Sequence, residues 1–261
     1  MSTGENEAAW QALGDELAVW RDGGRRATLW WRDDDAVRPG PALEKLLVLA
    51  ADHGVRPALA VIPQGVAPGL ADWLAEQPPA SLLQHGFAHR NHAPAGEKKA
   101  EFGADRPLHE LLADAAMGRE RMAALFPGRA LPVFVPPWNR IAPALVPLLP
   151  HARIAGLSRF RARIAAQPEP GLTEANTHVD PVDWHGGRGF AGEAAALAAL
   201  TRHLAARRAG EVDPEEPTGL LTHHALIDAA GWDFLARLLD VLAARDGADW
   251  LSAEEIFRLP P

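Results

Sequence analysis

The amino-acid sequence predicts a single barrel-like α/β domain in which parallel strands alternate with helices. Three observations support this prediction. Short apolar runs are followed by a polar cluster and then by a helical pattern, an order that repeats about six to eight times. The chain has 261 residues, 48% of them hydrophobic, which is enough to build one large core. Most polar clusters follow predicted strands, and active sites of parallel sheets are built at those strand ends.

Seven segments have the composition of buried strands. The first reads Ala-Thr-Leu-Trp-Trp and combines β-branched with aromatic side chains. The others are short apolar runs bounded by glycine, proline or polar residues. The predicted strands are 27–31, 56–62, 80–84, 131–135, 153–157, 174–179 and 218–222.

Helices are predicted between these strands from apolar residues at helical spacing. Gly23-Gly24 ends the first helix, and a proline begins the second. Ser252 with Glu255 forms a capping box, which predicts a last helical turn. Residues 1–24 are expected to pack as a helix on one domain, 25–261. The predicted helices are 5–22, 41–52, 68–75, 108–126, 143–149, 190–209 and 230–245, whereas 93–106 is predicted to be a polar surface loop and 158–171 is ambiguous.

Composition excludes several classes of function. A formal net charge of -8 leaves no basic stripe to neutralise phosphates, so a nucleic-acid partner is not expected. The chain has no cysteine, so any metal must be held by His, Asp or Glu. No run approaches the roughly 20 apolar residues of a membrane helix. The polar N-terminus does not have the pattern of a secretory signal, and a cytoplasmic location is expected.

Three consecutive acidic residues, Asp33, Asp34 and Asp35, end the first predicted strand. Adjacent carboxylates repel one another, and burying them is costly unless a proton or a cation offsets their charge. By itself the triplet is equally compatible with a solvated acidic turn and with a functional site.

His85 and His89 follow the third predicted strand, and on a helix or tight turn both rings would lie on one face. Such a pair alone is weak evidence for a metal. A carboxylate from the triplet completes an Asp/His/His set, which suits a catalytic metal with open positions and also removes the repulsion. We therefore predict a metal site at this end of the sheet.

Three further clusters follow later strands. Pro136-Pro137-Trp138-Asn139 is either a rigid strand exit or a loop that aims a backbone N–H at a developing oxyanion. Asp180 and Asp183 either stabilise a turn or supply a carboxylate that orients another group. His223 either is a satisfied polar residue or acts as a general acid.

Taken in order, these clusters resemble the motifs of the polysaccharide deacetylases of the NodB-homology type, carbohydrate esterase family 4. That family carries a strand-end Asp-Asp-Gly, a His-x-x-x-His, an Arg-x-Pro-Tyr-like loop, an Asp-x-x-Asp-Trp and a Leu-x-x-His. The corresponding residues here are Asp34-Asp35-Ala36, His85–His89, Val135-Pro136-Pro137-Trp138, Asp180–Trp184 and Leu220–His223. The resemblance covers about residue 27 to the C-terminus and implies a distorted (β/α) barrel with about seven parallel strands.

The resemblance also implies a role for each residue. Asp35, His85 and His89 would bind a divalent metal, most simply Zn²⁺, with Co²⁺, Ni²⁺ and Mn²⁺ as alternatives. Asp34 would be the general base and His223 the acid that protonates the departing amine. The remaining implied roles are orientation of a catalytic neighbour by Asp180, oxyanion stabilisation by the Trp138 backbone N–H, and substrate contacts by Trp184, Pro137 and Asn139.

Departures from the family pattern leave three alternatives open. Val135 replaces the third-motif arginine, the expected partner of Asp180, and either Arg32 or Arg140 could substitute. The paired aspartates could be Asp33-Asp34 in place of Asp34-Asp35. His224 also fits the Leu-x-x-His spacing and is a second candidate for the acid.

The implied activity is removal of an acetyl group from an N-acetylated sugar or polysaccharide. Because export is not expected, a small acetylated sugar is at least as reasonable a substrate as a polymer. Two alternatives are hydrolysis of another non-peptide amide or an O-acetyl ester, and a catalytically silent carbohydrate-binding relative.

Overall fold

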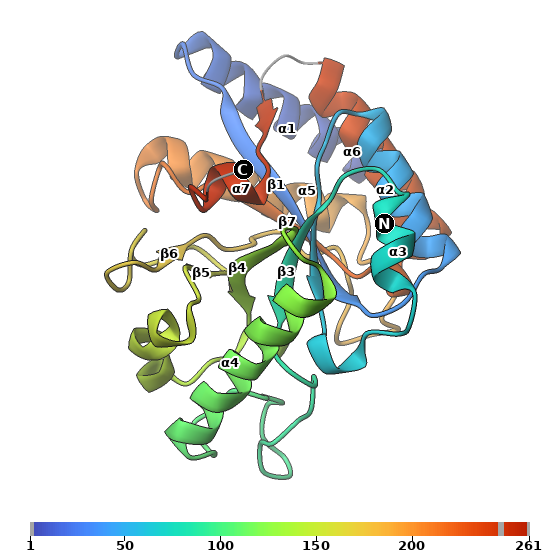
Figure 1. Ribbon diagram of the computed structural model, residues 1–261. Coiled ribbons are helices and arrows are strands. Elements are labelled where there is room, and N and C mark those ends of the chain that lie inside the picture. The colour runs from blue at the N-terminus through green and yellow to red at the C-terminus, as the bar shows by residue number, and fades with distance from the viewer. Residues whose placement is uncertain (1–2, 245–247, 260–261) are drawn as a thin grey trace.

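A curved parallel sheet forms the centre of the protein (Figure 1). The computed structural model describes residues 3–244 and 248–259. The strand order is β6-β5-β4-β3-β2-β1-β7, and β8 pairs in parallel with the first residues of β1. The strands are β1 (Ala27–Ala36), β2 (Ala58–Val61), β3 (Ser81–His85), β4 (Ala130–Val135), β5 (Gly156–Leu157), β6 (Thr173–Glu174), β7 (Thr218–Thr222) and β8 (Ala248–Trp250). The predicted α/β class and the seven parallel strands are confirmed.

The barrel closes through irregular backbone between β6 and β7. Val179 pairs with Leu220 of β7, and Phe160 pairs with Thr177, both as isolated parallel bridges. The predicted strand 174–179 is therefore regular only at its start. A physical reason is that side-chain oxygens accept hydrogen bonds from backbone N–H groups that would otherwise pair with a neighbouring strand. Asn176 Oδ1 accepts from the Arg159 N–H, and Glu216 Oε1 accepts from the Asn176 N–H.

Helices cover the outside of the sheet, and most match the predicted segments. The predicted helix 143–149 is instead a 3₁₀ helix, η3 (Pro143–Ala152), because Pro147 and Pro150 inside it lack the N–H groups of a regular α-helix. The predicted capping box between Ser252 and Glu255 is confirmed. Arg245, the last residue of the predicted helix 230–245, lies outside the described residues. The α-helices are α1 (Thr3–Asp22), α2 (Pro41–Asp52), α3 (Leu70–Ala75), α4 (Leu108–Leu125), α5 (Glu193–Ala209), α6 (Ala229–Ala244) and α7 (Ala253–Ile256).

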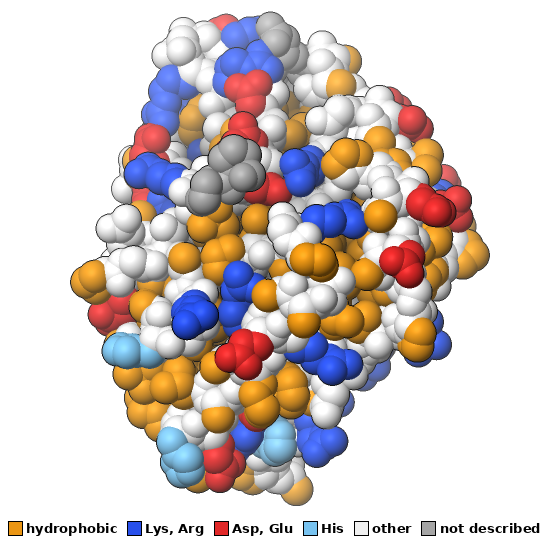
Figure 2. All heavy atoms as spheres, viewed as in Figure 1, with side chains coloured by type: hydrophobic (Ala, Val, Ile, Leu, Met, Phe, Trp, Pro, Cys, Tyr) orange, Lys and Arg blue, Asp and Glu red, His pale blue; other side chains and the backbone are white. Residues whose placement is uncertain are grey.

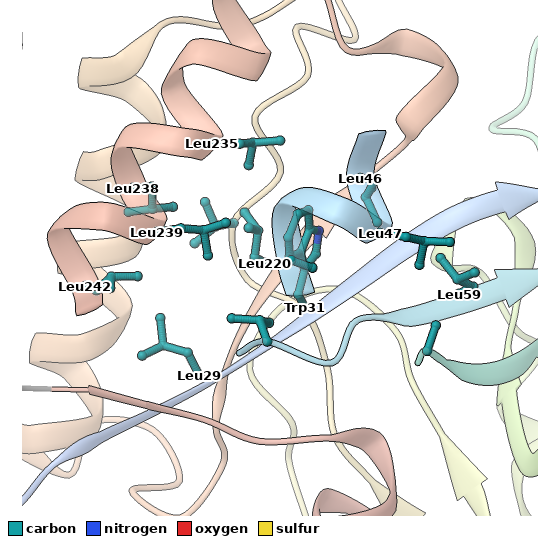
Figure 3. Packing of buried hydrophobic residues seen from close by; sticks show 14 of the residues in the cluster. Leu29, Trp31, Leu46, Leu47, Leu59, Leu220, Leu235, Leu238, Leu239 and Leu242 are labelled. Atoms are coloured by element: carbon teal, nitrogen blue, oxygen red, sulfur yellow. The ribbon is translucent and has the colours of Figure 1, made fainter. Parts of the chain in front are cut away.

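Two layers of apolar side chains hold the sheet in place. The outer layer joins Leu29 and Trp31 of β1 to leucines of α2 and α6 (Figure 3). The inner layer includes Trp30 of β1 and Val135 of β4, with Phe257 packed edge-on against Trp30. Because side chains alternate along a strand, successive residues of β1 point to opposite layers. This alternation decides where the acidic triplet points.

The N-terminal helix α1 is fixed to the barrel by polar contacts. Trp10 Nε1 donates to Glu193 of α5 at 2.9 Å, and Glu16 accepts from Arg208 at 2.8 Å. On the face shown in Figure 2, acidic and basic side chains of the described residues are interspersed without a continuous basic stripe. Among residues 3–244 and 248–259, no helix is long and apolar enough to cross a membrane.

Candidate active site

The backbone of β1 brings two neighbouring aspartates to the same site. Strict alternation would place Asp33 and Asp35 on one face and Asp34 on the other. The strand departs from this rule at its end, because Asp35 has a left-handed backbone with φ of 70° and the pairing with β2 shifts register between Asp33 and Ala36. Asp34 and Asp35 consequently both lie near His85 at the end of β3, whereas Asp33 faces β7.

Asp35 lies between His85 and His89. Its Oδ1 atom is 3.2 Å from His85 Nε2 and 3.3 Å from His89 Nε2. The two imidazole centroids are 5.1 Å apart. Both histidines therefore direct Nε2 toward one carboxylate oxygen, and the predicted Asp/His/His set is assembled by the fold.

The electrostatics of this group suit a cation. Burial would raise the pKa of Asp35, but its close contact with His85 and the charges of His85, His89 and His223 outweigh burial and lower that pKa. Burial and the neighbouring His85 lower the pKa of His89, which favours the neutral ring that a metal requires. Burial opposes a charged His85, but Asp34 and Asp35 together raise its pKa.

Two observations test whether these residues fit a metal. Asp35 Oδ1 is buried and has no hydrogen-bond partner among the described residues, so it is an acceptor without a donor there. His85 Nδ1 lies 3.1 Å from the Val135 carbonyl oxygen, so the ring proton is placed on Nδ1 and the lone pair of Nε2 points at Asp35. The donor set therefore fits a divalent cation.

Asp34 is held by Arg32 from two positions earlier on the same strand. Arg32 Nε donates to Asp34 Oδ1 at 2.9 Å, and Nη2 donates to Oδ2 at 3.1 Å. The remaining donors of Arg32 reach Ser158 Oγ at 2.7 Å, the Arg159 carbonyl at 3.3 Å and Asn139 Oδ1 at 2.8 Å. All five guanidinium N–H groups thus have acceptors, as a fully buried arginine requires.

This arrangement corrects the predicted substitution for the third-motif arginine. Arg32 binds Asp34 and not Asp180, and Arg140 donates to the Lys99 carbonyl at 2.7 Å. Asp180 accepts instead from Trp184 Nε1 at 2.7 Å and from the Val182 N–H at 3.0 Å. Ser158 was not anticipated, since a serine after a short strand carries no distinctive signal.

Asp33 and His224 form a separate buried pair. Asp33 accepts from the hydroxyl of Thr222 at 2.6 Å and from the backbone N–H of His224 at 2.9 Å, and it also contacts His224 Nδ1. Burial opposes a charged His224, but Asp33 raises its pKa. The Asp33 contacts join the ends of β1 and β7, and neither Asp33 nor His224 belongs to the converging ligand atoms of Asp35, His85 and His89, although the charge of Asp35 also acts to raise the pKa of His224.

His223 lies beside Trp184 and Asp180. The rings of His223 and Trp184 meet edge-on with centroids 5.0 Å apart, and His223 Nδ1 is buried with no hydrogen-bond partner in the part of the chain that the structure describes. Burial raises the pKa of Asp180, while the Trp184 hydrogen bond and the charge of His223 act against that rise. Asp183 accepts from the backbone N–H groups of His185 and Gly186, as expected for a turn residue.

The loop after β4 packs against the histidine pair. The Trp138 ring lies 4.4 Å from the His89 ring, centroid to centroid. Trp138, Asn139 and His89 all have φ near 55°, a conformation that is costly for non-glycine residues and concentrates at functional sites. Pro137 is buried, and the Asn139 amide oxygen is taken by Arg32.

The sequence did not indicate Glu101, which is buried within the predicted surface loop. Its carboxylate accepts from the backbone N–H groups of Phe87 and Ala88 at 3.1 and 2.7 Å. In the sequence, Glu101 is distinguished only by its place between two apolar residues, Ala100 and Phe102. The structure shows that both of these neighbours are also buried.

A second group of potential ligands, His178, His203 and Glu216, lies between α5 and the start of β7. His178 Nδ1 accepts the Gly219 N–H at 2.9 Å, so the neutral ring carries its proton on Nε2, the atom a metal would need. The His178 and His203 rings are stacked with centroids 3.5 Å apart, so the in-plane ring nitrogens of the two histidines do not point toward one shared position. These residues do not fit a metal and form a polar part of the core.

Comparisons with known proteins bear on the fold. No protein-family model matches the sequence, and no curated protein is similar to it. Solved structures do match. A candidate polysaccharide deacetylase from Mycobacterium smegmatis is 12% identical with a TM-score of 0.60, and the match covers 89% of this chain and 90% of that one.

Two further matches represent an enzyme and a protein described as inactive. A peptidoglycan N-acetylglucosamine deacetylase in complex with an N-hydroxybenzamide is 14% identical, with a TM-score of 0.53 and 90% of each chain covered. A pseudoenzyme of carbohydrate esterase family 4 from Bacillus anthracis is 11% identical, with a TM-score of 0.56, covering 89% of this chain and 66% of that one. The chain therefore has the distorted (β/α) barrel fold of the polysaccharide deacetylases of carbohydrate esterase family 4.

Proposed function

We propose that this protein is a metal-dependent hydrolase that removes an acetyl group from an N-acetylated sugar or polysaccharide. The observation that supports this best is the placement of Asp34 beside the Asp35, His85 and His89 group at the carboxyl end of the barrel. A carboxylate next to a cation-binding group is the arrangement needed to activate water for hydrolysis. The candidate deacetylases that share the fold are consistent with this proposal.

In this proposal Asp35, His85 and His89 hold the cation, and two nitrogen donors with one oxygen donor favour Zn²⁺ over harder ions. Co²⁺, Ni²⁺ and Mn²⁺ also accept this set. The bound cation would lower the pKa of a water molecule and polarise the acetyl carbonyl.

Asp34 acts as the general base that accepts the proton of the attacking water. Arg32 uses one lone pair on each carboxylate oxygen of Asp34 and leaves acceptor capacity free. The bidentate pair also fixes the orientation of the carboxylate, which reduces the entropy lost on the way to the transition state. The base is therefore oriented before substrate binds.

His223 donates a proton to the departing amine. It lies beside Trp184, and its charge interacts with both Asp35 and Asp180. An ionised Asp180 places a negative charge beside the ring that must donate the proton. Trp184 holds Asp180 through its indole N–H and, with 44% of its surface exposed, offers an aromatic wall to a sugar or acetyl group.

The loop Pro137–Asn139 is assigned to support of the reacting carbonyl. We place the Trp138 backbone N–H as a donor to the developing oxyanion. Asn139 and Pro137 retain their expected substrate contacts as part of this proposal, although Asn139 also connects the loop to Arg32.

One experiment tests the proposal as a whole. Purified protein is analysed for bound metal and assayed with N-acetyl and O-acetyl model sugars, beside the double variant Asp35→Asn/His85→Ala. We expect cation binding and N-acetyl hydrolysis only in the unchanged protein, and equal metal content in both proteins would refute the site. Preference for the O-acetyl substrate would favour esterase activity.

A catalytically silent relative is the second candidate. The observation that favours it is the fold shared with a pseudoenzyme, together with the third-motif arginine replaced by Val135. Sugar and cation binding without hydrolysis at any pH would establish that candidate in place of the enzyme.

A further inference from the structure

A buried carboxylate supports the turn that carries both histidines of the metal group. Glu101 is 1% exposed, although most of the segment around it is exposed. Its Oε2 accepts from the Phe87 N–H at 3.1 Å, and its Oε1 accepts from the N–H groups of Ala88 and Arg90 at 2.7 and 3.4 Å. Phe87 and Ala88 lie between His85 and His89 in the chain, and Arg90 directly follows His89.

The turn needs this acceptor because its own backbone cannot satisfy those groups. Gly86 and His89 both have left-handed φ values, 57° and 54°, so the segment follows neither a helix nor a strand. Glu101 supplies acceptors for N–H groups that would otherwise be left unpaired, as a carboxylate does in an anion-binding turn. A Cβ on Gly86 would collide with the Glu101 carboxylate and with Pro137, so the turn is packed directly on it.

The carboxylate is itself fixed to the core of the protein. Phe102 is fully buried and packs edge-on against Phe134 of β4, with ring centroids 4.9 Å apart. The Phe102 carbonyl accepts from the Ala142 N–H, and the Ala100 N–H donates to Asn91 Oδ1 at 2.9 Å. Glu101 therefore extends from an anchored piece of chain rather than from a loose loop.

Glu101 also contributes negative charge to the metal group without belonging to it. Its charge acts to raise the pKa of His89, against the larger effects of burial and His85. It is absent from the set of converging ligand atoms, since both of its oxygens face backbone N–H groups. A divalent cation held by Asp35, His85 and His89 would be balanced by the charges of Asp35 and Glu101, because Arg32 already neutralises Asp34.

We propose that Glu101 is a positioning residue that sets the affinity of the Asp35, His85 and His89 group for a divalent cation. It acts through the backbone of the turn, which fixes how the two imidazoles point. This inference rests on the proposed metal site but does not depend on the reaction. Supporting contacts of this kind typically change metal affinity about 10- to 100-fold when they are removed.

The test is a titration of metal-free protein with Co²⁺, whose absorption reports both binding and ligand geometry. Glu101→Gln replaces one acceptor oxygen with an amide NH₂, so that two hydrogen-bond donors face each other. We expect the Kd for Co²⁺ to rise about 10- to 100-fold and the spectrum at saturation to change. Glu97→Gln, an exposed residue of the same segment, removes the same charge and should bind like the unchanged protein. Glu101→Asp keeps both oxygens on a shorter side chain and should lie between the two.

Circular dichroism of the metal-free variants separates affinity from folding. If Glu101→Gln does not fold, the Kd and spectrum of Glu101→Asp decide the question. Unchanged affinity and spectrum in a folded Glu101 variant would overturn the inference while the metal site stands. An unchanged protein that binds no Co²⁺ would overturn both, and Co²⁺ binding without hydrolysis would count against the proposed activity alone.

Discussion

Arg32 and Asp34 form a two-point ion pair inside one strand, with donor–acceptor distances of 2.9 and 3.1 Å and almost no exposed surface on either side chain. Residues two apart on a strand point to the same face, so β1 supplies both the carboxylate and the guanidinium that orients it. Asn139 and Ser158 occupy the remaining side of the guanidinium and link it to the strands β4 and β5.

Replacing Arg32 should therefore lower turnover without removing the cation. Arg32→Lys keeps a positive charge but cannot hold both oxygens of Asp34, and a misplaced base can cost about 10²-fold in kcat. Steady-state kinetics should show the loss in kcat with little change in KM, and metal content should match the unchanged protein. Arg140→Ala is the control, since Arg140 donates to the Lys99 backbone carbonyl and not to Asp34. Full turnover in Arg32→Lys would contradict the role.

The three aspartates should separate into three phenotypes. Asp35→Asn should lose bound metal, and Asp34→Asn should keep metal but lose hydrolysis. Asp33→Asn should keep both and lower the free energy of unfolding by on the order of 3 kcal/mol, because it breaks a buried charged pair with His224. Metal analysis, turnover and urea denaturation measure these outcomes. Loss of metal in Asp33→Asn with retention in Asp35→Asn would mean that the triplet has been assigned in the wrong register.

Trp184 should influence the pH dependence of turnover through Asp180. Burial raises the pKa of Asp180, and the indole N–H of Trp184 opposes this. Trp184→Phe removes the donor, so the pKa should rise further. Asp180 presents a negative charge to the neighbouring His223 only when it is ionised, which is above the pKa of Asp180, so the acid limb of the kcat profile should move to higher pH. Trp73→Phe, on α3, should leave that limb in place, and an unmoved limb in Trp184→Phe would contradict the coupling.

The buried histidines His178 and His203 should make the stability of the folded protein decrease in acid. Burial, with the charges of His178 and Arg207, lowers the pKa of His203 to about 2, and burial lowers the pKa of His178. A group whose pKa is lower in the folded state stabilises the fold above its unfolded value, near 6.5, and this stabilisation is lost as pH falls below it.

A single neutral histidine of this kind costs about 2 kcal/mol of stability at pH 5 relative to pH 7. Urea denaturation at both values should show a smaller difference in His203→Gln, while His109→Gln, an exposed residue, should behave like the unchanged protein. Cation binding should be unaffected by His203→Gln. A lost equivalent of metal would show that this group does bind one.

The sequence by itself determined the alternation of strands and helices and the order of the polar clusters. Short apolar runs and helical periodicity are local signals, so seven strands could be placed before their pairing was known. The Asp/His/His set could be proposed because burying adjacent carboxylates is costly unless a proton or a cation offsets their charge. Three features could not be predicted from the sequence, because each depends on contacts with residues distant in the chain. They are the partners of Arg32, the burial of Glu101 and the pairing of His224 with Asp33.

Only the tertiary structure decided how the acidic triplet divides. A regular strand would have separated Asp34 from Asp35, and the left-handed backbone at Asp35 brings them to one site. That conformation is costly for a single residue and persists only where surrounding contacts hold it. Here the register shift against β2, the Arg32 network and the pairing of Asp33 with β7 supply those contacts, and none of them can be read from neighbouring residues alone.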